Sequence, residues 1–172
     1  SLTPSNENFA TSCIKAASKA TVPEAKIKEW LNKPEEGFCL DRIPDQMTGL
    51  YGSTNICDFT LFRMPHFYYL ESKATTADRF DFSMITDYQK KNMYEKSKIE
   101  GVRSYIIVLF AEHKRAFALD IRDIVDLEKQ GTKSINIKKI AKWTIPFFEI
   151  ETIPSRKALL DYSFESAKEL FS

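Results

Sequence analysis

Residues 102–110 constrain the fold more than any other stretch, because they form an almost uninterrupted apolar run with Tyr105, Ile106, Ile107, Val108 and Leu109 at its centre. A strand with one wet face alternates apolar and polar residues, whereas a continuous apolar run is typical of a central strand covered on both faces. We therefore expect a sheet with residues 102–110 inside it.

Further strands and several helices are predicted around this run. Short segments rich in aromatic and branched residues indicate strands; they are residues 38–43, 58–62, 67–73 and 115–120, with a hairpin turn near 112–114. Apolar residues at three- and four-residue spacing indicate helices; they fall at residues 8–20, 23–31, 85–100, 121–129, 136–143 and within the tail 155–171. Gly101 is expected to end the helix before the central strand.

The composition fits one folded domain over residues 1–172, since 43% of the residues are hydrophobic and no linker interrupts the chain. The net charge of +1 neither predicts nor excludes binding to nucleic acid. Cys13, Cys39 and Cys57 lack metal or disulfide spacing and are expected to be buried thiols in a reducing cytoplasm. No apolar span or signal-peptide pattern is present, so we expect a cytoplasmic protein without membrane contact.

The strands at 58–62 and 67–73 carry the charged residues of most interest. If their hairpin is centred between Met64 and Pro65, residues whose numbers sum to 129 face each other, and Asp58 faces Glu71. Since side chains alternate along a strand, Lys73 shares the face of Glu71. Pro65 is a poor central residue for a tight turn, so a longer symmetric loop is expected.

Two facing carboxylates repel each other unless a cation lies between them. Oxygen ligands of this kind suit Mg²⁺ or Mn²⁺, which can acidify a bound water, while a lysine positions or deprotonates that water. The alternative is a solvated strand face with an ordinary salt bridge. The apolar flanks of both strands favour a buried site.

The order of these residues resembles a known family. Asp58, twelve intervening residues, and then Glu71-Ser72-Lys73 have the form D-x(n)-E-x-K of the PD-(D/E)xK nucleases. The flanks at 52–59, Glu71 to Thr75, 80–83 and Gln89 are similar to the core of RecU-type Holliday junction resolvases, and the similarity covers roughly residues 42–140. It implies an α/β, restriction-endonuclease-like fold in which helices flank a mixed central sheet.

The resemblance also implies roles for individual residues. Asp58 and Glu71 would be metal ligands, Lys73 the catalytic lysine and Gln89 an accessory active-site residue. Thr75 would lie beside them as a backbone or phosphate contact.

One position departs from the family pattern. Relatives carry a metal-binding glutamate on the first helix, commonly after a phenylalanine, but here Phe9 is followed by Ala10. Either Glu7, about one turn earlier, replaces that ligand, or the site lacks it.

Several basic residues are candidates for contact with a substrate. Arg42 is expected either to face the substrate or to form a surface salt bridge. Lys90 and Lys91 are expected either to bind DNA phosphates, which they can do without recognising sequence, or to line a solvated helix face. His66 and His113 fall in predicted turns and are expected to be exposed.

The resemblance implies an Mg²⁺-dependent endonuclease that resolves four-way DNA junctions by paired nicks, acts as a homodimer and comes from a bacterium or a bacteriophage. Two alternatives remain open. One is a restriction-like or repair nuclease that cuts duplex or branched DNA. The other is a DNA-binding accessory protein that keeps the fold without cleaving, which the alanine at position 10 would permit.

Overall fold

Strand β5 (Val102–Phe110) lies inside a six-stranded sheet with the order β1-β2-β3-β5-β6-β8. The structure is a computed structural model that describes residues 23–44, 55–155 and 160–172. The other strands of the sheet are β1 (Cys39–Arg42), β2 (Phe59–Arg63), β3 (His66–Thr75), β6 (Arg115–Asp120) and β8 (Phe148–Ile150). Strands β3 and β5 pair in parallel and the remaining neighbours are antiparallel, so the sheet is mixed, as predicted.

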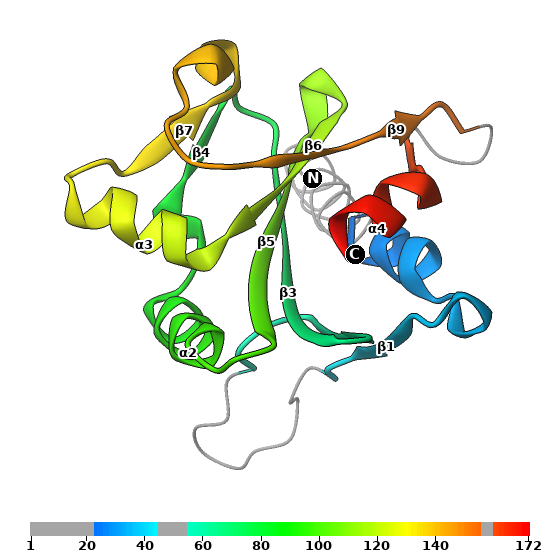
Figure 1. Ribbon diagram of the computed structural model, residues 1–172. Coiled ribbons are helices and arrows are strands. Elements are labelled where there is room, and N and C mark those ends of the chain that lie inside the picture. The colour runs from blue at the N-terminus through cyan, green and yellow to red at the C-terminus, as the bar shows by residue number, and fades with distance from the viewer. Residues whose placement is uncertain (1–22, 45–54, 156–159) are drawn as a thin grey trace, which may run out of the picture.

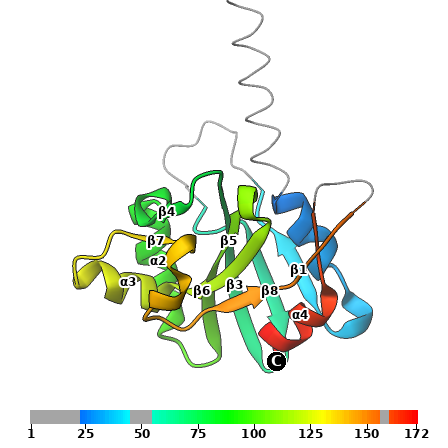
Figure 2. The same ribbon diagram turned by 90° about the horizontal axis from the view of Figure 1, so that it is seen from above.

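Helices cover both faces of this sheet (Figures 1 and 2). Ile107 and Leu109 of β5 belong to the core shared with helical residues 23–31 and α4 (Phe164–Leu170). Ile106, Val108 and Phe110 belong to the core on the other face, with α2 (Asp87–Ser97) and α3 (Ile121–Lys129). The side chains from Ile106 to Phe110 therefore alternate between two cores, one on each face of the sheet, which confirms the predicted coverage of the central strand.

Local sequence signals explain where the helices begin and end. Thr86 caps α2, because its side chain accepts a hydrogen bond from the backbone of Gln89 while the Gln89 side chain binds the backbone of Thr86. Asp120 caps α3 by accepting from the Arg122 backbone. Gly101, with φ of 81°, turns the chain into β5. The predicted helices at 23–31 and 121–129 are confirmed in place and length.

The hairpin between β2 and β3 has the predicted register but a shorter turn. Phe59 pairs with Leu70 and Arg63 with His66, so paired residue numbers sum to 129. The expectation of a longer loop was wrong: only Met64 and Pro65 separate the strands, and the peptide bond between them is cis. A cis proline at the third position is compatible with a tight type VI turn, which a trans proline would not fit.

The chain after α3 departs most from the sequence prediction. Its short strands β7 (Ser134–Asn136), β9 (Thr152–Ile153) and β10 (Asp161–Tyr162) were not predicted, nor was β4 (Arg79–Asp81), which pairs with β7. The helix expected at 136–143 is instead a 3-10 segment, η4 (Ile137–Lys142), with a non-helical residue at Lys139. In the described part of the tail, residues 155 and 160–172, regular helix occupies α4 alone.

Three short 3-10 segments complete the described elements: η1 (Pro34–Glu36), η2 (Phe82–Met84) and η3 (Ala111–His113), the last of which forms the β5–β6 turn. Cys57 is buried as expected, whereas the expectation was wrong for Cys39, which is exposed on the edge strand β1. Cys13 and the helix predicted at 8–20 lie outside the described residues. Among the helices that the structure describes, none is both long and apolar enough to cross a membrane.

Candidate active site

The β2–β3 hairpin brings two carboxylates together. Asp58 directly precedes β2, and its backbone N–H donates to the carbonyl of Leu70 at 3.1 Å, so Asp58 lies against the residue that Phe59 already pairs with and the regular register ends at Phe59. The side chain of Asp58 is fixed as well, because its Oδ2 accepts a hydrogen bond of 2.8 Å from the backbone N–H of Ser72. The predicted direct pairing of Asp58 with Glu71 is absent from the ladder, but the two carboxyls are close enough for the charge of Glu71 to act on Asp58.

Lys73 lies two residues after Glu71 on β3 and points to the same face. Its Nζ is 3.2 Å from Glu71 Oε1, and the side chains of Lys73 and Glu71 are only 19% and 4% exposed. A largely buried ammonium and a buried carboxylate thus form one ion pair beside Asp58. This burial argues against the alternative of a solvated salt bridge.

Burial makes both carboxyl groups weaker acids than usual. Burial is the largest effect on Asp58, followed by the charge of Glu71, and together they raise its pKa from 3.8 to about 7. Burial also raises the pKa of Glu71, although the Lys73 ammonium opposes the rise. Without a metal, the Asp58 carboxyl therefore holds its proton more tightly than an ordinary aspartate, and a cation beside it would reverse that shift.

One oxygen of the pair is left for such a cation. Glu71 Oε2 is buried and has no hydrogen-bond partner among the described residues. A buried oxygen without a partner is costly unless a ligand satisfies it. Within the described parts of the chain, no three His, Cys, Asp or Glu side chains are arranged as a ready metal site. Mg²⁺, however, is commonly held by one or two carboxylates with water and phosphate oxygens, so the Asp58–Glu71 pair fits it.

Sequence reasoning missed a third carboxylate, Glu24. It lies in the first turn of helical residues 23–31, and its negative charge raises the pKa of both Asp58 and Glu71. Its Oε2 is held 2.9 Å from an Arg42 guanidinium nitrogen. The available signal was a glutamate directly after Pro23 at a predicted helix start, but only the fold places that turn beside β2. Glu7, the substitute ligand expected from sequence, lies outside the described residues, as does Ala10.

Gln89 and Thr75 flank the central residues. The Gln89 amide, in the first turn of α2, lowers the pKa of Glu71, so the structure brings Gln89 to the site as expected. Thr75 ends β3, where its hydroxyl donates to the Arg79 carbonyl at 3.3 Å and accepts from the Ala77 N–H at 3.1 Å. Thr75 thus shapes the loop that leaves the site.

The three basic residues expected near a substrate, Arg42, Lys90 and Lys91, differ in exposure and in whether a carboxylate already binds them. Arg42 forms the salt bridge with Glu24, one of the two alternatives left open. Lys90 is paired with Glu128 of α3 at 2.8 Å and is largely buried, so the structure does not support a phosphate contact there, whereas Lys91 is exposed.

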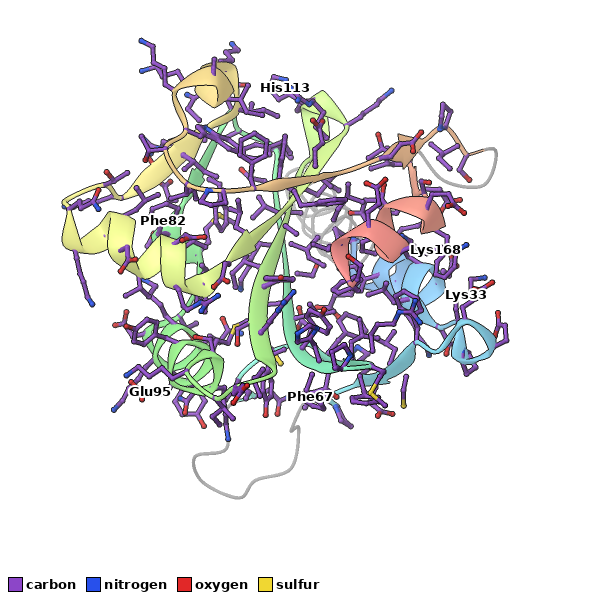
Figure 3. All side chains as sticks on the ribbon, in the orientation of Figure 1. Lys33, Phe67, Phe82, Glu95, His113 and Lys168 are labelled. Carbon is purple, nitrogen blue, oxygen red and sulfur yellow. The ribbon has the colours of Figure 1, made fainter. Side chains whose placement is uncertain are left out.

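The two histidines are less exposed than expected, and of the two only His113 lies in a turn. His66 begins β3 and contacts Arg103 at 3.2 Å, and its Nδ1 is buried. His113 lies at the β5–β6 turn (Figure 3), where its Nε2 is 2.6 Å from an Asp78 carboxylate oxygen. Both are partly buried because a neighbouring loop or strand supplies a charged partner, which the sequence did not reveal.

Comparison with known proteins identifies the family of the chain. The chain matches the family described as "RecU: Recombination protein U" over residues 5–162. The chain belongs to the recombination protein U family. The match includes Asp58, Glu71, Lys73 and Gln89, and it confirms the resemblance inferred from the sequence.

A solved structure is similar to this member of the recombination protein U family. It is the Holliday junction resolvase Hjc of Archaeoglobus fulgidus, with 13% sequence identity and a TM-score of 0.47. The similarity covers 69% of this chain and 88% of that one. No curated protein matches the chain in sequence.

Proposed function

We propose that this recombination protein U family member is a metal-dependent endonuclease that resolves four-way DNA junctions by paired nicks. One observation carries the proposal: Glu71 is buried with an unpartnered oxygen, is paired with Lys73 and lies close enough to Asp58 for their charges to interact. Paired carboxylates with a lysine suit hydrolysis of a phosphodiester, and the family is one of recombination proteins. The Hjc of Archaeoglobus fulgidus is described as a resolvase of these junctions.

Asp58 and Glu71 would hold the divalent ion, Mg²⁺ or Mn²⁺. When bound, the ion supplies Lewis-acid chemistry that acidifies a water molecule and offsets charge on the phosphate. The Ser72 N–H keeps Asp58 in position for this role, since it occupies one carboxylate oxygen and leaves the other free of that bond. Glu24, which is held in place by Arg42, would add negative charge near the two carboxylates and so favour a cation there.

Lys73 would act on the attacking water or the scissile phosphate. Its ammonium is held by Glu71 Oε1, which fixes it on the same face as both carboxylates. From this position the Lys73 ammonium can orient the water or stabilise negative charge that develops on the phosphate, and only its neutral amine form could accept a proton from the water. Gln89 would orient Glu71 from the first turn of α2.

The experiment compares a labelled four-way junction with a linear duplex of the same sequence, in Mg²⁺, Mn²⁺, Ca²⁺ and chelator. We expect cleavage of the junction in Mg²⁺ or Mn²⁺, binding without cleavage in Ca²⁺, and no cleavage in chelator. Equal cleavage of duplex would favour the restriction-like or repair alternative. Junction binding without cleavage in any metal would favour the accessory-protein alternative.

Variants assign the chemistry to this site. Lys73→Ala should lower the cleavage rate by roughly 10²–10⁴-fold, the range of a lost acid–base group. Glu71→Gln, which keeps the side-chain shape, should abolish metal-dependent cleavage. Both should fold and bind the junction nearly as well as the parent, measured by circular dichroism and gel shift. Parental cleavage rates in either variant would remove the assignment.

The active species in this proposal is a two-fold symmetric homodimer. A four-way junction presents two equivalent strands, and an isologous dimer supplies two matched sites from one kind of chain.

A further inference from the structure

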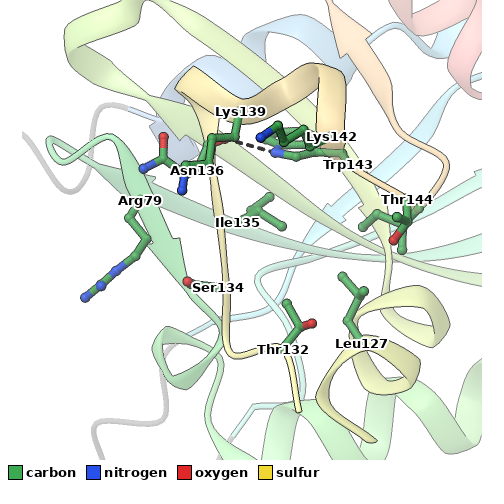
Figure 4. Close-up of a pocket in the computed structure, with 11 residues that line it drawn as sticks. Arg79, Leu127, Thr132, Ser134, Ile135, Asn136, Lys139, Lys142, Trp143 and Thr144 are labelled. Atoms are coloured by element: carbon green, nitrogen blue, oxygen red, sulfur yellow. Dashed lines mark hydrogen bonds between the residues drawn. The ribbon is translucent and has the colours of Figure 1, made fainter. Parts of the chain in front are cut away.

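A second candidate binding site lies on the face of the sheet that carries α2 and α3. A pocket of about 470 Å³ opens between the end of α3, strand β7 and the η4 segment. Figure 4 shows Ile135 in the middle of its lining, with Leu127 and Thr132 on one side and Lys139, Lys142 and Trp143 on the other. The volume is in the range of pockets that hold a small organic molecule or one nucleotide.

The charge of this pocket is positive. Arg79, Lys139 and Lys142 line it, and none of the described lining residues is acidic. Arg79 is paired with Asp81 at 3.0 Å, whereas Lys139 and Lys142 are exposed and form no ion pair with any described residue. Two lysines with no carboxylate partner among the described residues, beside a pocket open to solvent, favour an anionic ligand.

The wall of the pocket is apolar and aromatic. Leu127, Ile135 and Ile145 contribute aliphatic surface, and Trp143 contributes an indole ring. The ring is held in place, because its N–H donates to the Asn136 carbonyl at 3.0 Å and Phe117 packs edge-on against it at 5.1 Å. A fixed aromatic surface beside lysines is the combination with which proteins hold single-stranded nucleotides, since the base contacts the ring and the phosphate contacts the cations.

The pocket is close to the cleavage site along the chain. Arg79 follows Lys73 by six residues, so their Cα atoms are separated by at most roughly 20 Å. The Thr75 hydroxyl donates a hydrogen bond to the Arg79 carbonyl, so the chain between these two residues turns back on itself. One turn of duplex DNA is about 34 Å long, which exceeds this separation. A DNA strand bound at the proposed cleavage site can therefore also reach the pocket.

We propose that this pocket binds one unpaired nucleotide of the substrate DNA outside the cleavage site, with its phosphate on Lys139 and Lys142 and its base against Trp143. The inference rests on the proposed function, because it takes DNA as the substrate. Four-way junctions have exposed strand-exchange points, and a pocket of this kind would favour them over a fully stacked duplex.

The test uses the two tryptophans as reporters in the full chain without metal, so that cleavage plays no part. Trp143 lines the pocket, whereas Trp30 is buried and its N–H is bonded to the Ser163 carbonyl. In nitrogen-15 spectra, an oligothymidylate of about eight nucleotides should shift the Trp143 indole signal and leave that of Trp30 unchanged. A Trp143→Phe spectrum assigns the two signals.

Two matched double variants distinguish binding in the pocket from nonspecific electrostatic attraction between the protein and DNA. Lys139→Ala with Lys142→Ala should remove the Trp143 shift and reduce the salt slope of oligonucleotide binding by about 1.4, the value for two contacts to a single strand. Lys33→Ala with Lys168→Ala removes the same charge near Phe164, well away from the pocket (Figure 3), and should leave both measurements unchanged.

Three outcomes would overturn the inference. The first is an unshifted Trp143 signal in an oligonucleotide complex, and the second is equal loss of binding in the two double variants. The third is binding of thymidine monophosphate as tight as that of the oligonucleotide, which would assign the pocket to free nucleotides. Failure of the proposed function itself would appear separately, as absence of junction cleavage while the Trp143 shift remains.

Discussion

At the scale of single residues, the role of Glu24 follows from the fold and could not be predicted from the sequence. Its charge acts on both Asp58 and Glu71, and Arg42 holds it in place. We expect Glu24→Gln to raise the Mg²⁺ concentration that gives half-maximal cleavage by about 10–100-fold, the usual effect of groups that support metal ligands. Titration of the cleavage rate with Mg²⁺ measures this.

Glu29→Gln is the matched control for that change. Glu29 is on the same helical segment but is 68% exposed and paired with Lys26. It should leave the metal requirement unchanged. Equal shifts in the two variants would show that Glu24 acts only through the overall charge of the helix.

The raised pKa values of the carboxyl pair predict how stability depends on pH. A carboxyl whose pKa is higher in the folded than in the unfolded chain binds its proton more tightly when folded. Its stabilisation is complete below the unfolded value near 4 and is lost as pH rises through the folded value, about 7 for Asp58. The metal-free protein should therefore lose stability between about pH 5 and pH 8.

Thermal unfolding in chelator across this range measures the effect. Asp58→Asn removes the titrating group and should flatten the dependence, with a higher Tm than the parent at pH 8. Mg²⁺ should raise the Tm of the parent at pH 8 and have less effect on the variant. A parent whose stability increases with pH in this range would contradict the assignment.

At the scale of elements, the α2 cap links helix stability to the site. Thr86→Ala removes the hydroxyl that accepts from the Gln89 backbone N–H, which should cost about 1 kcal/mol and loosen the first turn of α2, and with it the Gln89 side chain near Glu71. We expect a lower cleavage rate than in Thr86→Ser, which retains a hydroxyl. Unfolding in urea and junction cleavage measure the two effects.

Asp120→Ala provides the comparison, since Asp120 caps α3 and does not contact Gln89. It should cost similar stability without the matching loss of cleavage. If both alanine variants lose cleavage equally, the contribution of Gln89 is only structural.

The elements also show what could be predicted from sequence and why. The apolar run of β5 was sufficient to predict the centre of the sheet, and the two strands around Pro65 were sufficient to predict their register from Phe59–Leu70 to Arg63–His66, because burial and alternation act within a few residues. The break in that register at Asp58 was not predicted. The segments after α3 were not predictable in this way. Strand β7 pairs with β4, more than fifty residues earlier, so its conformation depends on a distant partner. Glu24 reaches the site for the same non-local reason.

At the scale of the whole molecule, the proposed homodimer predicts how the two cuts in a junction are divided between its subunits. The solution mass at micromolar concentration should be twice the chain mass of 19.9 kDa. A mixed dimer with one Glu71→Ala subunit should nick only one strand of the junction, because each subunit supplies one site. A monomer that makes both cuts at the parental rate would exclude the dimer.

The short outer strands of the sheet restrict how two copies can meet. Among the described residues, one edge is the four-residue β1, which carries Asp41 and Arg42, and the other is the three-residue β8, which carries Glu149. Short edges with charged side chains resist strand addition, by which sheets of separate molecules join through backbone hydrogen bonds. A continuous intermolecular sheet is therefore disfavoured, and the same two edges protect the protein from polymerising while it is concentrated on DNA.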